Sequence, residues 1–274
     1  MPSRQLPSLT PEQVVAVQDA LLANADRLLV AAAGLLASNV PLARSLAILG
    51  LEESGKVIAL HERRVAIAYA PEGEPFVTDA LQDLWSSHDK KLSLVHRFLV
   101  EERYWFGSKP ADPEENSQAL GAIRRWARKQ DRAKQRGFYV DLDKIGNVLD
   151  PAASADENAL RTVIEHVHQI GWQIRLGEHI EATQQAEESR GAAPADEAEI
   201  EYLRSLLGSD TELFEELVES MRAGRPGRPL HNDGYRLKLP ENPFGTFGRP
   251  GYEAESRELR RLRNEHDRDR KTER

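Results

Sequence analysis

Regular helical spacing of apolar residues over the first 190 residues constrains this chain more than any other feature. Apolar side chains recur there every three or four positions, a period that gathers them on one face of an α-helix. Thr10, Pro11 and Gln13 fit a helix start, because threonine caps, proline suits the first helical position and glutamine completes a capping box. We therefore expect the chain to bury itself by packing helix against helix.

Loop signals divide this region into five predicted helices. Asn39-Val40-Pro41 ends the first, a Pro/Gly-rich loop ends the second, and Arg136-Gly137 ends the fourth. A short extended segment, residues 137–141, follows the fourth helix. Short loops between helices predict an all-α fold, an up-down helical bundle. The expected helices cover residues 11–38, 41–70, 78–104 and 113–134 and a long segment that begins near Ser154.

A C-terminal helical and coil extension is predicted after the bundle. A small, polar linker leads to two short amphipathic helices, and a Pro/Gly-rich stretch with interspersed basic residues comes next. The last twenty residues alternate charge signs, which is typical of either a solvated helix or a disordered tail. We expect a helical bundle over residues 10–190, a short helical appendage over 195–223, and a basic coil with a charged tail over 224–274.

Composition narrows the class of protein. The chain has no cysteine, which excludes disulfides and thiolate chemistry, and its formal net charge of −8 argues against nucleic-acid binding over the whole surface. No apolar run reaches the roughly 18 residues that a membrane span needs. The N-terminus lacks an apolar core followed by a cleavage site, so we expect a cytoplasmic protein without a membrane partner.

One glutamate breaks the apolar pattern of the second predicted helix. In the stretch LAILGLEESGK, helical spacing places Glu53 on the same stripe as Leu46, Leu49, Val57 and Leu60. A lone buried carboxylate is costly unless another group pairs with it. We therefore expect Glu53 to face a partner inside the bundle.

The third predicted helix supplies such a partner. His88 lies on its apolar stripe between Leu84 and Leu92, and Lys91 lies beside it. The two helices are consecutive and so are expected to be antiparallel neighbours, which brings Glu53, and with it Lys56, near His88 and Lys91. This cluster is either catalytic or a structural hydrogen-bonded pair, and Lys56 alternatively belongs to a surface pair with Glu52.

Three motifs occur in a defined order: LAILGLEESGK in the second helix, SHDKKL in the third and KQRGFYVDLD after the fourth. In this order and spacing they resemble the AbiV family, abortive-infection proteins of phage defence within the HEPN-like helical superfamily. The resemblance covers roughly residues 15–185 and does not reach the C-terminal extension.

The resemblance implies a HEPN-like bundle that limits phage infection. Many HEPN-like proteins are metal-independent ribonucleases in which an arginine precedes a histidine by a few residues and both act on the ribose and phosphate. Arg161 and His166 of the fifth helix fit this pattern. The pattern is loose, since it also fits Arg161 with His168 and pairs in the C-terminal extension, and the alternative for Arg161 and His166 is a solvated helix surface.

A basic strip on the fourth predicted helix is the candidate for nucleic-acid contact. Arginines and lysines recur along it, and Phe138 and Tyr139 follow, so charge and stacking could hold single-stranded RNA. The alternative is that the aromatic residues close the end of the bundle. The residues predicted to bind nucleic acid are Arg124, Arg125, Arg128, Arg132, Arg136 and Tyr139.

Together these features predict a phage-defence effector of the AbiV type that acts as a metal-independent ribonuclease or inhibits translation. The alternative is a non-enzymatic helical module that binds a phage or host protein or neutralises a toxin. No cofactor or metal site is expected, RNA or a phage or host protein is the expected partner, and we expect a homodimer.

Overall fold

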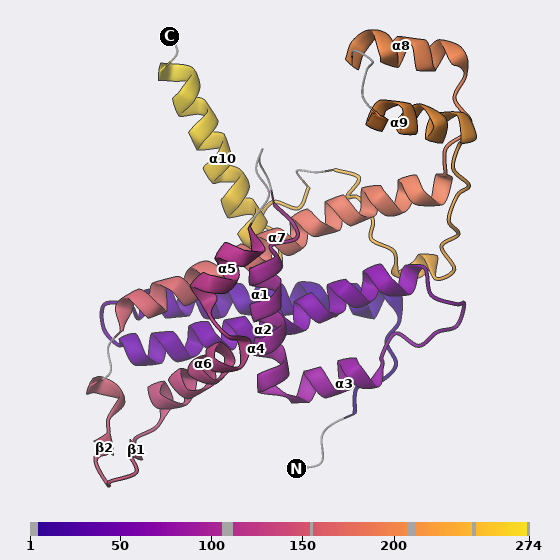
Figure 1. The fold of residues 1–274 in the computed structure, drawn as a ribbon. Helices are drawn as coiled ribbons and strands as arrows, with labels where there is room; N and C mark the ends of the chain where they lie inside the picture. The colour runs from indigo at the N-terminus through magenta and orange to yellow at the C-terminus, as the bar shows by residue number, and fades with distance from the viewer. Residues whose placement is uncertain (1–4, 106–111, 154–155, 208–211, 243–244, 273–274) are drawn as a thin grey trace.

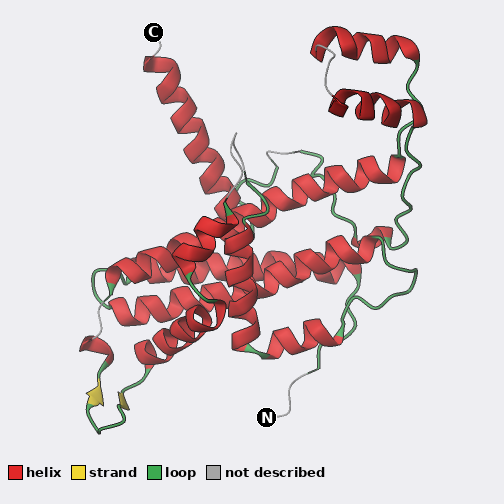
Figure 2. Ribbon diagram, viewed as in Figure 1, coloured by secondary structure: helices red, strands yellow, loops and turns green. Residues whose placement is uncertain are grey.

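A computed structural model describes residues 5–105, 112–153, 156–207, 212–242 and 245–272. The described chain is built from helices and one small hairpin, in agreement with the predicted all-α fold (Figure 1, Figure 2). No helix in these ranges is long and apolar enough to cross a membrane.

The first two helices begin where the sequence predicted. Helix α1 (Pro11–Gly34) starts with a capping box in which Thr10 Oγ1 accepts from Gln13 N and the Gln13 side chain accepts from Thr10 N. Helix α2 (Val40–Ala68) starts after Asn39, whose side chain accepts from Leu42 N.

The third predicted helix is two helices, α3 (Asp79–Ser86) and α4 (His88–Glu101). Ser87 has an extended backbone between them, and its hydroxyl accepts a hydrogen bond from Lys90 N at 3.2 Å. This cap starts a new helix at His88, so the chain turns there although apolar residues continue on both sides.

The fourth predicted helix is also divided, into α5 (Pro113–Leu120) and α6 (Ile123–Phe138). After α6 the chain forms a hairpin of β1 (Asp141–Leu142) and β2 (Val148–Leu149), in place of the single extended segment that was expected. Asp143 closes its turn, because its carboxylate accepts from the backbone N–H groups of Ile145 and Asn147.

Helix α7 (Glu157–Arg190) is the longest helix and follows the short turn η1 (Pro151–Ala153). Its cap is Asp156, which accepts from Ala159 N; the predicted start at Ser154 lies outside the described residues. A short link connects α7 to the helical appendage, α8 (Glu197–Leu207) and α9 (Glu212–Ala223), which has a small apolar cluster of its own.

The bundle is organised around α2, which packs against α1, α4, α6 and α7. Its neighbours bury α2 on almost every side, and Ile48, Leu51 and Ile58 are completely buried. The core is therefore a sheath of helices around one central helix, and polar residues of α2 that enter it must find partners there.

Two glycines let the other helices approach α2 closely. A Cβ atom at Gly55 would lie 2.7 Å from the backbone oxygen of Lys91, and one at Gly137 would lie 2.3 Å from the backbone oxygen of Pro41. The first contact sets α4 against α2, and the second sets the end of α6 against the start of α2. Ser45 Oγ strengthens the second approach by donating to the Lys134 carbonyl at 2.8 Å.

The first part of the C-terminal extension packs against the bundle, and its last part projects away from the bundle. Asn232, just before the turn η2 (Asp233–Tyr235), donates to the carbonyls of Ile67 and Ala70 at the end of α2. Helix α10 (Glu253–Thr272) begins against α7 and α1, and its far end projects into solvent (Figure 1). The charged tail is thus helical, one of the two structures that the sequence allowed.

Replacing Gly55 by alanine tests the close approach of α2 and α4. The added methyl group would meet the backbone of α4, which cannot rotate away as a side chain can, so we expect a loss of about 1–3 kcal/mol of unfolding free energy. Urea unfolding followed by circular dichroism measures it. Gly34→Ala is the matched control: nothing lies within 4 Å of its Cβ position, so stability should stay the same or rise by up to about 1 kcal/mol. Equal effects of the two substitutions would contradict the close contact.

Candidate functional site

A buried carboxylate joins three helices at the centre of the site. Glu52 of α2 is 3% exposed, and its Oε2 atom lies 2.5 Å from Nδ1 of His88 at the start of α4. Its Oε1 atom accepts from Lys134 Nζ of α6 at 2.5 Å, and Lys91 Nζ of α4 lies 3.5 Å from Oε2. The side chains of both lysines are 6% exposed. One carboxylate therefore collects three nitrogens from two neighbouring helices.

The partners of Glu52 keep it ionised. Burial raises the pKa of a carboxyl group, but here the hydrogen bonds from Lys134 and His88 and their charges outweigh that effect, and the pKa of Glu52 lies below its usual value. For Lys91 burial dominates and lowers its pKa, although Glu52 opposes the shift. We infer that Glu52 is ionised in this cluster because Lys134 and His88 stabilise its negative charge.

His88 is the exposed member of this cluster. Its side chain is 57% exposed, while the carboxylate that it contacts is almost completely buried. An ionised carboxylate can only accept hydrogen bonds, so Nδ1 carries the proton that Glu52 accepts, and Nε2 is left as an acceptor in the neutral ring. An imidazole fixed in this way can act as a general base or, when protonated, as a general acid.

The carboxylate of this cluster is Glu52, and the prediction of Glu53 is wrong. Glu53 does not contact His88; its Oε1 accepts from Lys56 Nζ at 2.9 Å, and both side chains are less than one-fifth exposed. The predicted apolar stripe through Leu46 and Leu49 is in fact the most accessible side of α2. The error has a physical cause: periodicity assumes one buried face, whereas α2 is central and buried on nearly every side.

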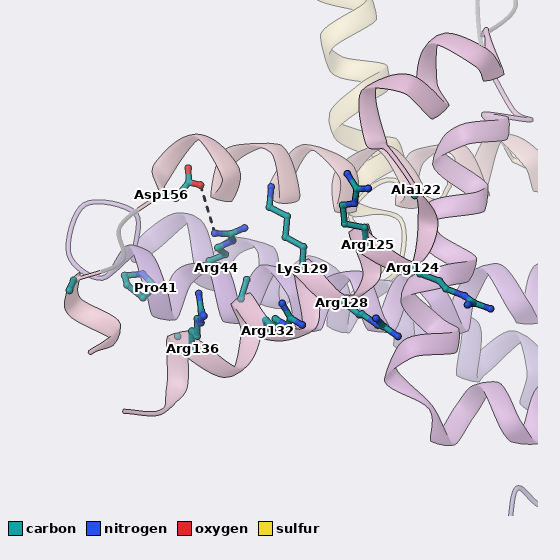
Figure 3. Close-up of a pocket in the computed structure, with 13 residues that line it drawn as sticks. Pro41, Arg44, Ala122, Arg124, Arg125, Arg128, Lys129, Arg132, Arg136 and Asp156 are labelled. Carbon is teal, nitrogen blue, oxygen red and sulfur yellow. Dashed lines mark ion pairs between the residues drawn. The ribbon is translucent and has the colours of Figure 1, made fainter. Parts of the chain in front are cut away.

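A basic groove lies beside α6. Its volume is about 860 Å³, and it is bounded by α6, the start of α2 and the turn that precedes α7 (Figure 3). Its polar lining consists of basic side chains and one carboxylate. The lining residues with a charged side chain are Arg44, Arg124, Arg125, Arg128, Lys129, Arg132, Arg136 and Asp156.

Most of these basic groups are not neutralised by the protein. Arg44 Nη1 lies 3.9 Å from Asp156, but the six basic residues of α6 that line the groove form no ion pair with any residue that the structure describes. Figure 3 shows Lys129 and Arg125 on the side of Arg44, whereas Arg124 and Arg128 point the other way. The helix thus presents uncompensated positive charge in two directions, an arrangement suited to a polyanion.

The predicted nucleic-acid residues lie on α6 and directly after its end. The five arginines that were predicted on α6 all line the groove, and Tyr139 follows it with 64% of its surface exposed. Tyr139 and Phe138 therefore do not plug the bundle, because Phe138 is also exposed. Their role in binding stays a prediction.

Arg161 and His166 do not converge. Arg161 is exposed and donates from Nη2 to Glu157 at 2.5 Å one turn earlier on α7. His166 is largely buried beside Trp126, with ring centroids 6.5 Å apart, and its burial lowers its pKa to about 4. The alternative of a solvated helix surface thus holds for Arg161 and fails for His166, and within the chain these two side chains have different surroundings.

Sequence reasoning missed Lys134 and a second buried network. Lys134 is the last residue of the fourth predicted helix and was assigned no partner, yet its ammonium group lies 2.5 Å from Glu52 Oε1. On the other side of α2, Arg64 and Arg175 both bond to the Glu178 carboxylate, at 2.9 and 2.6 Å. Arg64 continues the buried spacing of Leu60 on α2, so the signal used for Glu53 was available for it.

The donor sets do not resemble a metal centre. Among the described residues, no three or more histidine, cysteine, aspartate or glutamate side chains gather as a metal site requires. The groups at the site are a carboxylate, an imidazole, two ammonium groups and a row of guanidinium groups. Their chemistry is proton transfer and anion binding.

Comparison with known proteins gives one match. Residues 13–172 match the family model HEPN_AbiV, described as AbiV. No curated protein and no solved structure matches the chain. The matched residues include Glu52, His88 and all of α6, so the cluster and the groove both lie within the matched region.

Exchanging each glutamate for glutamine tests which one is the buried anchor. Glu52→Gln removes the carboxylate that the buried ammonium groups of Lys91 and Lys134 share, and Lys134 keeps only its pair with Asp131 at 3.2 Å, so we expect a loss of about 3–5 kcal/mol of unfolding free energy. Glu53→Gln removes only the more accessible ion pair with Lys56 and should lower the unfolding free energy by about 1 kcal/mol or less. Urea unfolding of the two variants gives the comparison, and a larger loss for Glu53→Gln would contradict the assignment.

Proposed function

The chain belongs to the AbiV family, and we propose that it is an abortive-infection protein that acts on RNA. Family membership supports the role in abortive infection. The observation that carries the action on RNA is the groove beside α6, where six basic side chains have no ion pair among the described residues. A polyanion would neutralise them, and RNA presents phosphates in a continuous row.

Single-stranded RNA fits this surface. Phosphates would lie along the guanidinium groups of α6, and the exposed ring of Tyr139, which follows the helix, offers a face on which an unpaired base can stack. A duplex would present its bases in the stack and leave such a ring without a partner. The groove therefore favours an unpaired strand.

His88 is the proposed acid–base residue. In the neutral ring Nε2 can accept the proton of a ribose 2′-hydroxyl, whose oxygen then attacks the adjacent phosphorus to form a 2′,3′-cyclic phosphate. The 5′-oxygen of the next nucleotide leaves and takes a proton from solvent water, and the imidazolium returns its proton to solvent. The buried carboxylate of Glu52 holds the ring and stabilises the imidazolium that forms. The arginines of α6 would supply the positive charge that stabilises the phosphate in the transition state.

A non-enzymatic role is the second candidate. The observation that favours it is the separation of Arg161, which is paired with Glu157, from His166, which is buried beside Trp126. If cleavage in this family depended on that pair, this protomer would not present it on one surface. The groove would then bind RNA, or a partner, without cutting it.

Removing two groove arginines tests RNA binding. Arg128→Ala with Arg132→Ala should weaken binding of a short single-stranded RNA and lower the slope of log affinity against log salt by about 1.4, because each lost phosphate contact contributes about 0.7. Fluorescence anisotropy at several salt concentrations measures both. Arg27→Ala with Arg263→Ala removes the same charge from exposed sites outside the groove and should change neither quantity beyond a small general effect. Equal losses in the two variants would refute a groove-specific site.

Replacing His88 tests the chemistry. His88→Ala should slow RNA cleavage by about 10²–10⁴-fold in buffer with a chelator and leave RNA affinity close to that of the wild type. It removes one partner of the buried Glu52, so we expect a loss of about 1–2 kcal/mol of unfolding free energy, smaller than that of Glu52→Gln because Lys134 and Lys91 still pair with the carboxylate. Gel analysis of labelled RNA and phage plating give the readouts. Arg161→Ala and His166→Ala are the comparison variants. Loss of cleavage in these two but not in His88→Ala would overturn the assignment, and phage protection without any cleavage would support the non-enzymatic role.

A further inference from the structure

Negative charge is concentrated in the helical appendage. Residues 195–223 contain nine acidic and two basic residues, within a chain whose formal net charge is −8. Both arginines are used inside the appendage: Arg222 bonds to Glu197 at 2.8 Å, and Arg204 approaches Glu215 at 3.4 Å. Glu216 and Glu219 of α9 are exposed and form no ion pair with a described residue. The appendage therefore keeps an unneutralised acidic surface.

The acidic appendage and the basic groove lie at opposite ends of α7. The groove includes Asp156, the cap at the start of α7, whereas α8 begins at Glu197, seven residues after α7 ends at Arg190 (Figure 1). A helix of 34 residues is roughly 50 Å long. The link from Gly191 to Asp196 can span at most about 20 Å when fully extended. Backbone hydrogen bonds between Ala192 and Arg225 restrict it further. The appendage therefore cannot reach the groove of its own chain.

We propose that the α8–α9 appendage of one copy docks into the basic groove of a second copy. The two surfaces have opposite charge, and most of the basic groups of the groove, like Glu216 and Glu219 of the appendage, form no ion pair with a residue that the structure describes. Such charge complementarity steers association and sets orientation. Because every chain carries one groove and one appendage, two copies can satisfy both contacts at once around a two-fold axis.

Apolar side chains border both surfaces. Tyr202 of α8 is 66% exposed and Leu217 of α9 is 44% exposed. The segment that contains the β1–β2 hairpin begins after Gly137 and ends at Ala153, and both of these residues line the groove. Within this segment the side chains of Val140 and Ile145 are 67% and 84% exposed. These side chains can pack together when the charged surfaces meet, which would add a contact that salt does not screen.

Docking in this way would compete with RNA. The same arginines of α6 would hold either the carboxylates of the partner's appendage or phosphates, so the paired form would have a covered groove. The inference uses the charges of the groove and not the cleavage step, so it stands or falls separately from the assignment of His88.

Molar mass measured by light scattering tests the proposal on the full chain. We expect a dimer at about 0.1 M salt and dissociation at about 1 M salt, where the Debye length falls from about 10 Å to 3 Å. Glu216→Lys with Glu219→Lys should raise the dissociation constant at least about tenfold, and so should Arg128→Glu with Arg132→Glu, because each places like charges opposite one another.

An equimolar mixture of these two charge-reversed variants supplies the decisive measurement. In the mixed pair each reversed surface meets its complement, so the dimer should return although neither variant forms it alone. Glu72→Lys with Glu241→Lys, an equal charge change at exposed sites elsewhere, should leave the dimer intact. A monomeric wild type at low salt, a dimer insensitive to the reversals, or a mixture that stays monomeric would each overturn the proposal.

RNA binding by the same variants separates this inference from the proposed function. Glu216→Lys with Glu219→Lys frees the groove and should bind the short RNA at least as tightly as the wild type. If RNA binding still depends on Arg128 and Arg132 while no dimer forms, the docking proposal alone is wrong. If the dimer behaves as expected while the groove arginines do not affect RNA binding, the proposed function is wrong and the docking stands.

Discussion

A carboxylate buried among helices must be neutralised where it lies, and Glu52 is neutralised by two helices at once. Lys134 brings α6 to α2, while His88 and Lys91 bring α4, and Gly55 provides the space in which α4 can approach. A misplaced helix would leave several buried charges without partners, at a cost of several kcal/mol. The same contacts fix the ring of His88 at the surface, so packing and the proposed chemistry depend on one set of bonds.

Helix starts could be predicted from the sequence because capping is local. Thr10 was predicted as a cap and caps Gln13 N three residues on, while Asn39 was predicted as a helix break and also caps Leu42 N. The break at Ser87 escaped prediction because apolar spacing continues from Leu84 to Leu92 and hides the turn. The hairpin at Asp141 escaped for a related reason: two-residue strands carry almost no periodic signal.

The site was predicted in kind but not in detail. His88 and Lys91 were expected in an inner polar cluster and lie in one, yet the carboxylate is Glu52 and the second cation is Lys134. Periodicity cannot separate adjacent residues on a helix that is buried all round. Lys134 is 82 residues from Glu52 in the sequence, so only the tertiary structure reveals their contact. The same is true of the pairing of Arg64 with Glu178.

The buried network around Glu178 shows where the folding unit ends. The family match stops at residue 172, inside α7, but Arg175 and Glu178 lie beyond it and bond to Asp19 and Arg64 within it. The Gly251 carbonyl of the C-terminal extension also accepts from Arg175. A boundary drawn by family likeness therefore cuts through a shared hydrogen-bond network. Removing the C-terminal extension would take away the Gly251 carbonyl to which the buried Arg175 guanidinium donates, so the bundle and the extension share one buried charge network.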